Sequence, residues 1–291
     1  MDKRLERIFE EVRLDSVSGA SAIVGSVCER VLEVVTSKSP PTPADLRGFA
    51  VGLVTAQPNM APMWNLANSI LHAGADATEL RKTLKATAEH HRKAHELIGR
   101  GTAKVLAGKT VVTNSSSRAV LSALTFAARI SKPVVRVAES RPQREGLLLA
   151  DQLSKLGIPV EVFADAALGS ATVGADVALA GVDAITDKSV IAKIGFSHLM
   201  LSAREVGLSR VILGDSTKFA PIHFSEDPRD PLEVVEESCR GITVINRYFE
   251  ETSLDIVDMV ITESAKLRPE EAAAKASKIR LAPELRALRL T

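Results

Sequence analysis

The stretch VVTNSSSRAVLSAL, residues 111–124, decides the fold, because a short β-branched run ends in polar residues and passes directly into a helix-compatible sequence. The same pattern recurs after Gly108. Its strand-like runs are TVVTNS (110–115), PVVRVAES (133–140), PVEVFAD (159–165), VALAGVDAI (177–185), RVILGD (210–215) and ITVINRYF (242–249). A spacing of roughly two dozen residues from strand to strand is typical of successive βα units.

Continuous apolar strands of this kind are buried on both faces, which indicates a parallel sheet with helices on each side. The first part of the chain differs, since LERIFEEVRL, SAIVGSVCERVLEVVTS and PADLRGFAVGLVTAQ have helical periods and few strand signals. We therefore predict an α/β protein with a helical N-terminal domain over residues 1–106 and a ligand-binding domain over residues 107–291. The tail from Pro269 predicts a short polar helix and an extended end.

The composition excludes several functional classes. The 37 basic and 36 acidic side chains nearly cancel, so nothing favours direct nucleic-acid binding or an anionic membrane surface. The longest apolar runs, such as residues 177–182, are far shorter than the roughly 20 residues of a membrane helix. The N-terminus does not resemble a signal or transit peptide. We expect a cytoplasmic protein in which Cys28 and Cys239 are buried, reduced thiols.

Polar residues follow the first strand where it turns into a helix. Asn114, Ser115, Ser116 and Ser117 would bring hydroxyls and free backbone N–H groups to the positive end of the helix dipole. Such a terminus binds anions, and Arg118 adds a cation. The alternative is that the serines only cap the helix, but capping requires one of them. The pattern therefore favours a phosphate or sugar site.

Other candidates follow later strands. Arg141 could offer a planar fork to a phosphate, with Glu139 orienting it or binding a sugar hydroxyl, or the two could simply pair with each other. Asp183 follows an apolar run, where a carboxylate is costly unless it is bonded or used, so it is a candidate general acid or base. Its alternative role is a helix N-cap. Lys193, expected to open an apolar helix, and Lys218 could complete the site or be solvated.

Two further features are set aside. His90, His91 and His95 occur late in a helix, where only His91 and His95 lie on one face. A zinc site would need a third ligand, which the sequence does not show, so a solvated basic face is the preferred interpretation. Gly99 and Gly101 precede the first strand, so they indicate a linker between the halves. Neither a GxGxxG nor a P-loop pattern occurs. We therefore expect no metal and no dinucleotide or other cofactor.

Several of these stretches together resemble a known family. They are QPNMAPMWNLAN (57–68), VVTNSSSRAVL (111–121), ESRPQREG (139–146), FADAALG (163–169), GVDAITDKSVIAKIG (181–195), TKF (217–219) and NRYFEETSLDIVDMVITE (246–263). The chain resembles the alpha, beta and delta subunits of translation initiation factor 2B, a superfamily that also contains ribose-1,5-bisphosphate isomerase and methylthioribose-1-phosphate isomerase. The resemblance implies an N-terminal helical domain, a Rossmann-like domain and assembly as homodimers or hexamers.

The resemblance also implies roles for individual residues. The isomerases use a cysteine and an aspartate as a proton-handling pair; Asp183 matches the aspartate, but Ser115 stands at the cysteine position. A serine hydroxyl is far harder to ionise than a thiol, whose reference pKa is about 8.5. The isomerases carry Arg-Gly-Ala where this chain has Ser18 followed by Gly19 and Ala20. They also carry Asn-Lys where this chain has Ala192-Lys193.

These departures favour a factor 2B-like protein that binds a sugar phosphate or nucleotide without turnover. The alternative is an aldose–ketose isomerase acting on a phosphosugar such as ribose 1,5-bisphosphate or methylthioribose 1-phosphate. A third alternative is a scaffolding subunit whose pocket binds no ligand. An interaction with a translation factor is also compatible with the sequence. We expect self-association through the C-terminal domain, since YFEETSLDIVDMVI (248–261) is apolar and weakly charged.

Overall fold

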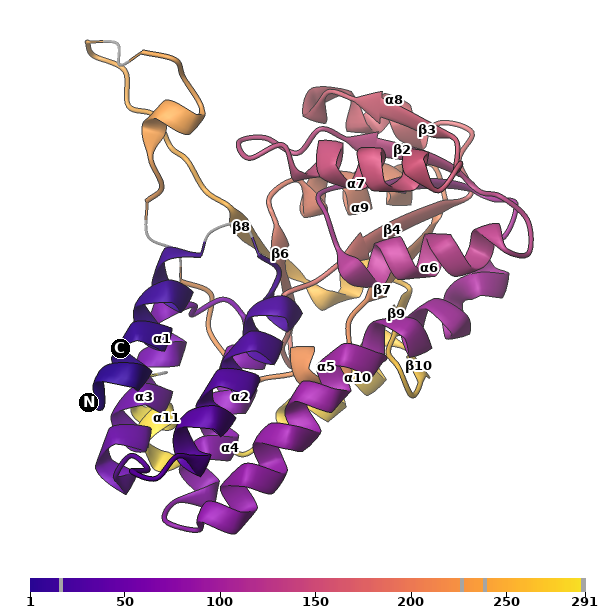
Figure 1. Ribbon diagram of the computed structural model, residues 1–291. Coiled ribbons are helices and arrows are strands. Elements are labelled where there is room, and N and C mark those ends of the chain that lie inside the picture. The colour runs from indigo at the N-terminus through magenta and orange to yellow at the C-terminus, as the bar shows by residue number, and fades with distance from the viewer. Residues whose placement is uncertain (16–17, 226–227, 238–239, 289–291) are drawn as a thin grey trace.

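The structure is a computed structural model that describes residues 1–15, 18–225, 228–237 and 240–288. Figure 1 shows a bundle of helices, formed by the first part of the chain, beside a layered α/β region formed by the rest. The two parts are in contact along α5, a long helix that runs from the bundle to the sheet region. The arrangement confirms the predicted α/β class with an N-terminal helical part.

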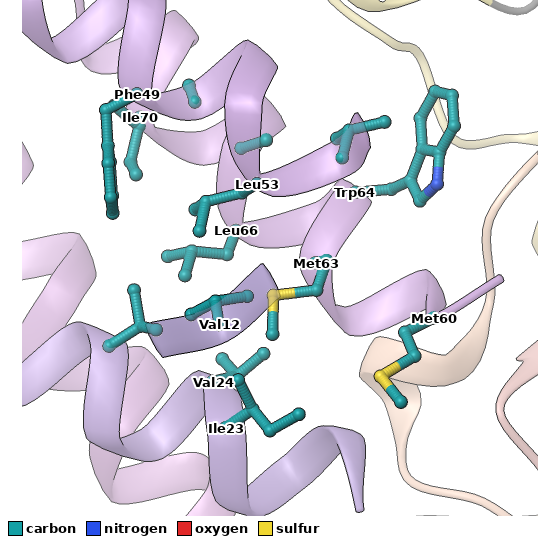
Figure 2. Close-up of a cluster of buried hydrophobic side chains, with 14 of the residues drawn as sticks. Val12, Ile23, Val24, Phe49, Leu53, Met60, Met63, Trp64, Leu66 and Ile70 are labelled. Carbon is teal, nitrogen blue, oxygen red and sulfur yellow. The ribbon is translucent and has the colours of Figure 1, made fainter. Parts of the chain in front are cut away.

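Five helices occur in the described residues of the N-terminal part. They are α1 (Lys3–Leu14), α2 (Ala20–Thr36), α3 (Pro43–Ala56), α4 (Ala61–Ala73) and α5 (Ala77–Leu106). Local signals set their starts: Thr42 and Asp45 form a capping box on α3, and Asp76 accepts from two backbone N–H groups of α5. Figure 2 shows the apolar cluster that holds the helices together, in which Phe49 and Leu66 lie fully buried among neighbouring aliphatic side chains.

A seven-stranded sheet forms the centre of the α/β part. Its order is β10-β9-β7-β4-β1-β2-β3. The strands are β1 (Thr110–Thr113), β2 (Val134–Ala138), β3 (Val160–Phe163), β4 (Val177–Gly181), β7 (Ser209–Leu213), β9 (Met259–Ile261) and β10 (Lys266–Leu267). Each pairing is parallel except that of β9 with β10. The predicted parallel sheet is confirmed. Strands β2 and β3 lie on one side of β1 and β4 lies on the other, so the strand order reverses at β1 and leaves a crevice there.

Both faces of the sheet are covered, as continuous apolar strands require. Val111 of β1 packs with α6 (Arg118–Ala128) and α7 (Glu145–Lys155) on one face. Its neighbour Val112 packs on the other face, with α8 (Leu168–Thr172), α9 (Phe196–Glu205) and α10 (Pro269–Ser277). Successive side chains of a strand point to opposite faces, so an apolar run without alternation marks a strand buried on both sides.

A small antiparallel sheet accounts for the differences from the predicted strands. It contains β5 (Ala184–Ile185), β6 (Ser189–Lys193) and β8 (Phe249–Ser253) in the order β5-β6-β8. The run 177–185 is therefore two strands in two sheets, and within 242–249 only Phe249 lies in a strand. Lys193 ends β6 instead of opening a helix, since α9 begins three residues later. The apolar pattern was present in each case, but a short run does not reveal its pairing partner.

Helix α5 belongs to both cores. Leu80 and Leu84 lie in the bundle core, whereas Ile98 and Leu106 pack against the sheet and α6. Gly99 permits this contact, since a Cβ at its position would lie 2.4 Å from the Ser122 Oγ of α6. Gly99 is therefore a helix-packing residue and not part of a linker. The proposed division after residue 106 falls at the end of this shared helix.

The C-terminal segment returns to the bundle. Leu281 and Leu285 are buried in the same core as the N-terminal helices, and Leu285 lies on α11 (Pro283–Leu288). The extended end predicted after α10 is thus partly helical. Cys28 is a free, fully buried thiol, and burial raises its pKa to about 12. Cys239 lies outside the described residues.

None of the helices within the described residues combines the length and the hydropathy needed to cross a membrane.

Candidate functional site

A cavity of about 390 Å³ opens at the carboxyl ends of β1, β4 and β7. This is the edge of a parallel sheet at which ligands bind, beside the change in strand order. Its walls come from the starts of α2 and α6, the middle of α5, the start of α7 and the loops after the three strands. The polar residues of the lining are Ser18, Ser21, His95, Asn114, Ser115, Ser116, Ser117, Arg118, Glu145, Gln152, Asp183, Asp215 and Lys218. Gly19 and Ala20 also line it.

The loop after β1 divides the three serines among different tasks. Ser117 is the N-cap of α6, and its Oγ accepts from the Val120 N–H at 3.5 Å. Ser115 has a positive φ of 58°, and its backbone N–H donates to Ser140 Oγ at 2.7 Å. One serine therefore caps the helix, as the capping alternative requires, while the side chains of Ser115 and Ser116 stay available to the cavity. Ser115 is buried, with 7% of its surface exposed.

The N-termini of α6 and α2 both meet this cavity. Neither helix has an acidic residue in its first turn, and the Gly19 N-cap of α2 provides no side-chain hydrogen bond. Arg118, the first residue of α6, makes no ion pair with any described residue, although it lines the cavity. Backbone N–H groups in the first turn of a helix lack partners within that helix and carry partial positive charge. The cavity thus has two places at which an anionic group would be stabilised.

Asp183 and Lys218 form an ion pair at the cavity wall. Their Oδ1 and Nζ atoms lie 3.4 Å apart, and the side chains are only 16% and 9% exposed. The backbone of Asp183 is fixed by a bond from its N–H to the Ile191 carbonyl and by one from Ala61 N–H to its own carbonyl. Asp183 therefore stands in a rigid turn between β4 and β5 and does not cap a helix. A paired, partly desolvated carboxylate can accept or donate a proton at bound substrate.

Asp215, two residues after the end of β7, is a cavity residue that was not predicted from the sequence. It is 1% exposed and accepts from Thr217 N–H at 2.9 Å and from Ser21 Oγ at 3.3 Å. Burial alone would raise its pKa, but the contact with His90 and the charge of Lys218 outweigh burial and hold the pKa well below its usual range. The sequence signal that could have identified Asp215 is the one that indicated Asp183, namely a carboxylate that follows an apolar strand.

Three predicted residues do not line the cavity. Arg141 Nη2 donates to the Val234 carbonyl at 3.1 Å, and Glu139 and Arg141 do not pair with each other in the described chain. Lys193 Nζ lies 2.7 Å from Glu145 Oε1 and 5.0 Å from the centre of the Tyr248 ring. Lys193 therefore does not line the cavity itself. It forms an ion pair with Glu145, which does line the cavity.

The histidines of α5 are not a solvated basic face. His91 is 4% exposed, His95 lines the cavity, and His90 Nε2 lies 3.5 Å from Asp215 Oδ1. Burial lowers the pKa of both His91 and His95 to about 4, whereas the Asp215 contact raises the pKa of His90. The helical period did place His91 and His95 on one face, but that face meets the sheet region instead of solvent. Among the described residues, no cluster of three or more possible ligands is arranged for a metal.

The buried imidazole of His91 predicts a pH-dependent stability. Its pKa falls from 6.5 to about 4 on folding, so the unfolded chain binds more protons between these values and stability is lost as the pH falls through this window. At pH 5 the cost from His91 alone is about 2 kcal/mol. We expect His91→Leu to lose less unfolding free energy than the parent between pH 7 and pH 5. Denaturant titrations at the two pH values measure this, and equal losses would contradict it.

The sequence matches the initiation factor 2 subunit family over residues 16–269. The chain belongs to this family. Ribose 1,5-bisphosphate isomerase from Archaeoglobus fulgidus is 30% identical over 279 residues, which cover 90% of this chain and 89% of the relative. The resemblance seen in the sequence is thereby confirmed.

Solved structures agree with the fold. Translation initiation factor eIF-2B from Pyrococcus horikoshii OT3 aligns with a TM-score of 0.80 and 26% identity, over 92% of this chain and 98% of that one. The 5-methylthioribose 1-phosphate isomerase of the same organism aligns with a TM-score of 0.68 and 20% identity, over 95% and 88% of the two chains. The second likeness shows a shared fold alone. Proteins named as isomerases and proteins named as factors therefore share the architecture of this family member.

Proposed function

We propose that the protein is an aldose–ketose isomerase for a pentose that carries two phosphates, of the ribose 1,5-bisphosphate class. The observation that supports it is the pairing of two helix N-termini without acidic first turns around one cavity that also contains the Asp183 carboxylate. Two anion-binding ends fit a substrate with two phosphates better than one with a single phosphate. The relative that is 30% identical is named for this reaction.

The reaction requires a definite set of proton movements. In the cyclic 1-phosphate, the C2–H, O2–H and C1–O4 bonds break while C1–H and O4–H bonds form, and C2 becomes a carbonyl. One proton moves from C2 to C1 and one from the 2-hydroxyl to the ring oxygen, so atoms and electrons balance within the sugar. Asp183 would take the proton from C2 and return it to C1. Lys218, 3.4 Å from the Asp183 carboxylate, would stabilise the negative charge that develops on the sugar oxygens.

A factor 2B-like binding protein without turnover is the second candidate, and it was the preferred interpretation of the sequence. Ser115 favours it, because a hydroxyl replaces the thiol expected of the isomerases at this position of the cavity wall. The isomerase now ranks first because the 30% identical relative that matches nearly the full chain is named an isomerase.

A binding and turnover panel separates the candidates. The purified protein is mixed with ribose 1,5-bisphosphate, methylthioribose 1-phosphate, ribose 5-phosphate and nucleoside monophosphates, and the thermal shift and ketose formation are measured. A shift plus ketose from the bisphosphate is expected. A thermal shift without ketose formation would make a binding protein the better description. The absence of a shift with every compound would favour a scaffolding subunit that binds none of them.

Substitution of Ser115 distinguishes a contact from a proton-transfer group. We expect Ser115→Ala to weaken binding or turnover less than about tenfold, because a neutral hydroxyl contributes one hydrogen bond of about 0.5–1.5 kcal/mol. If the hydroxyl itself moved protons, kcat would fall by about 10²–10⁴ with little change in KM. Steady-state kinetics of Ser115→Ala with ribose 1,5-bisphosphate therefore decide between the two roles.

Self-association through the C-terminal domain also stays a prediction. The segment 248–261 places Tyr248 and Phe249 in the core, so its apolar character is largely used inside the chain. The exposed apolar residues Ile242 and Ile245, at 63% and 75% exposure, lie just before this segment in the chain. Sedimentation is expected to show a mass above 31.1 kDa at micromolar concentration. A monomer alone would contradict the prediction.

A further inference from the structure

His95 is a cavity residue with unused hydrogen-bonding capacity. Its side chain lines the same cavity as Ser115 and Asp183, yet neither ring nitrogen has a hydrogen-bond partner among the described residues. Both nitrogens are buried. Buried polar atoms without partners are costly and uncommon in folded proteins. The His95 side chain lines the cavity, and a turn of its ring about χ2 would offer one of these unpartnered nitrogens to a molecule that enters.

Helix α5 holds His95 at this position. Gly99 lies one turn after His95 on the same helix face and allows α5 to approach α6 until a Cβ would lie 2.4 Å from Ser122 Oγ. This close approach brings His95 toward the start of α6, which carries Arg118 and the serines of the β1 loop. The two histidines before it differ from His95: His90 lies 3.5 Å from Asp215, and His91 also has two buried, unpartnered ring nitrogens but does not line the cavity. His95 is thus the α5 histidine that lines the cavity.

The charges around His95 favour a neutral ring. Burial lowers its pKa to about 4; the nearby Asp215 opposes this, while Lys218, Arg118 and His90 add to it. A neutral imidazole carries one N–H donor and one acceptor nitrogen, so it can donate to one oxygen and accept from another. Neutral imidazoles serve in this way as electrophiles toward developing oxyanions in sugar isomerisation. Ser115, by contrast, offers only a hydroxyl that is hard to ionise.

We propose that His95 is a catalytic residue of the isomerisation, which bonds to the sugar and relays the hydroxyl proton. The proposal rests on the proposed function. In one concerted step, the His95 N–H gives its proton to the ring oxygen O4 as the C1–O4 bond breaks, while the other ring nitrogen takes the proton of the 2-hydroxyl. The ring ends as the opposite neutral tautomer, and the enolate oxygen left on C2 becomes the carbonyl when C1 is protonated. Asp183 moves the carbon-bound proton from C2 to C1, and no other reactant is consumed.

The test compares His95→Gln and His95→Asn with the parent, using ribose 1,5-bisphosphate. Glutamine and asparagine keep a donor and an acceptor but cannot relay a proton, so kcat is expected to fall by about 10²–10⁴ with KM within about threefold of the parent. His198→Gln is the matched control, because His198 is exposed on α9 and lies outside the cavity lining. It should keep the parent kcat and KM. Thermal melting confirms that each variant is folded.

A rescue experiment separates proton relay from support of the fold. Added imidazole should restore part of the kcat of His95→Ala but none of the loss in Asp183→Asn. If the parent turns over and both His95→Gln and His95→Asn stay within about threefold in kcat, His95 has no catalytic part and the isomerase assignment stands. If the folded parent gives no ketose, the proposed function fails and the catalytic role of His95 fails with it.

Discussion

Asp183→Asn is expected to lower kcat for ribose 1,5-bisphosphate by about 10²–10⁴ while the fold and the affinity for the product stay close to those of the parent. The substitution keeps the shape of the side chain and removes its capacity to accept a proton. The Asp183 backbone bonds to Ile191 and Ala61 do not involve the side chain, so the turn after β4 should persist. Steady-state rates and binding of ribulose 1,5-bisphosphate by calorimetry provide the two measurements.

The control for charge removal is Asp187→Asn, on an exposed turn between β5 and β6 outside the cavity lining. It changes the net charge by the same amount and should leave kcat unchanged. Lys218 complicates Asp183→Asn, because its ammonium then loses an ion pair at 3.4 Å in a largely buried position. A drop in melting temperature is therefore expected as well. If kcat falls less than about threefold in a folded variant, Asp183 does not transfer protons in the reaction.

The fold was predictable to a large extent because its signals are local. A β-branched run that ends in polar residues, followed by a helical period, marked β1 through β4 and β7 in their observed order. The failures occurred where a long-range partner decides the structure. Ala184 and Ile185 pair with β6 in a second sheet, and Met259 to Ile261 pair with β7, and neither partner is visible in the segment itself.

The lining of the cavity was predictable where it follows the topology. Ser115 and Asp183 meet in one cavity because the carboxyl ends of neighbouring parallel strands lie at one edge. His95 was not predictable in this way, since it reaches the cavity only through the close packing of α5 on α6 at Gly99. Glu139 and Arg141 follow β2 at the same edge, but Arg141 bonds to the Val234 carbonyl and neither residue lines the cavity. Topology therefore indicates at which edge of the sheet the cavity lies, and packing decides which side chains line it.

Arg118→Gln is expected to raise KM for ribose 1,5-bisphosphate by about 10- to 150-fold with kcat largely unchanged. A charge-assisted hydrogen bond to a phosphate contributes about 1.5–3 kcal/mol, and the guanidinium can make two of them. Arg118 has no ion pair with any described residue, so its loss breaks no internal contact and should leave the melting temperature unaltered. Because phosphate is held in the ground state and the transition state alike, the loss falls on KM.

Two features make this expectation specific to a phosphate. The effect should shrink as salt is raised from about 0.05 to about 0.5 M, since the screening length around the exposed guanidinium falls from roughly 14 Å to roughly 4 Å. Inhibition of the parent by inorganic phosphate should weaken in Arg118→Gln by a factor similar to the KM change. Arg204→Gln, which removes an exposed arginine at the end of α9, should change neither value. Equal KM values for Arg118→Gln and the parent would mean that no phosphate sits at the start of α6, and that the anionic ends of the substrate are held elsewhere.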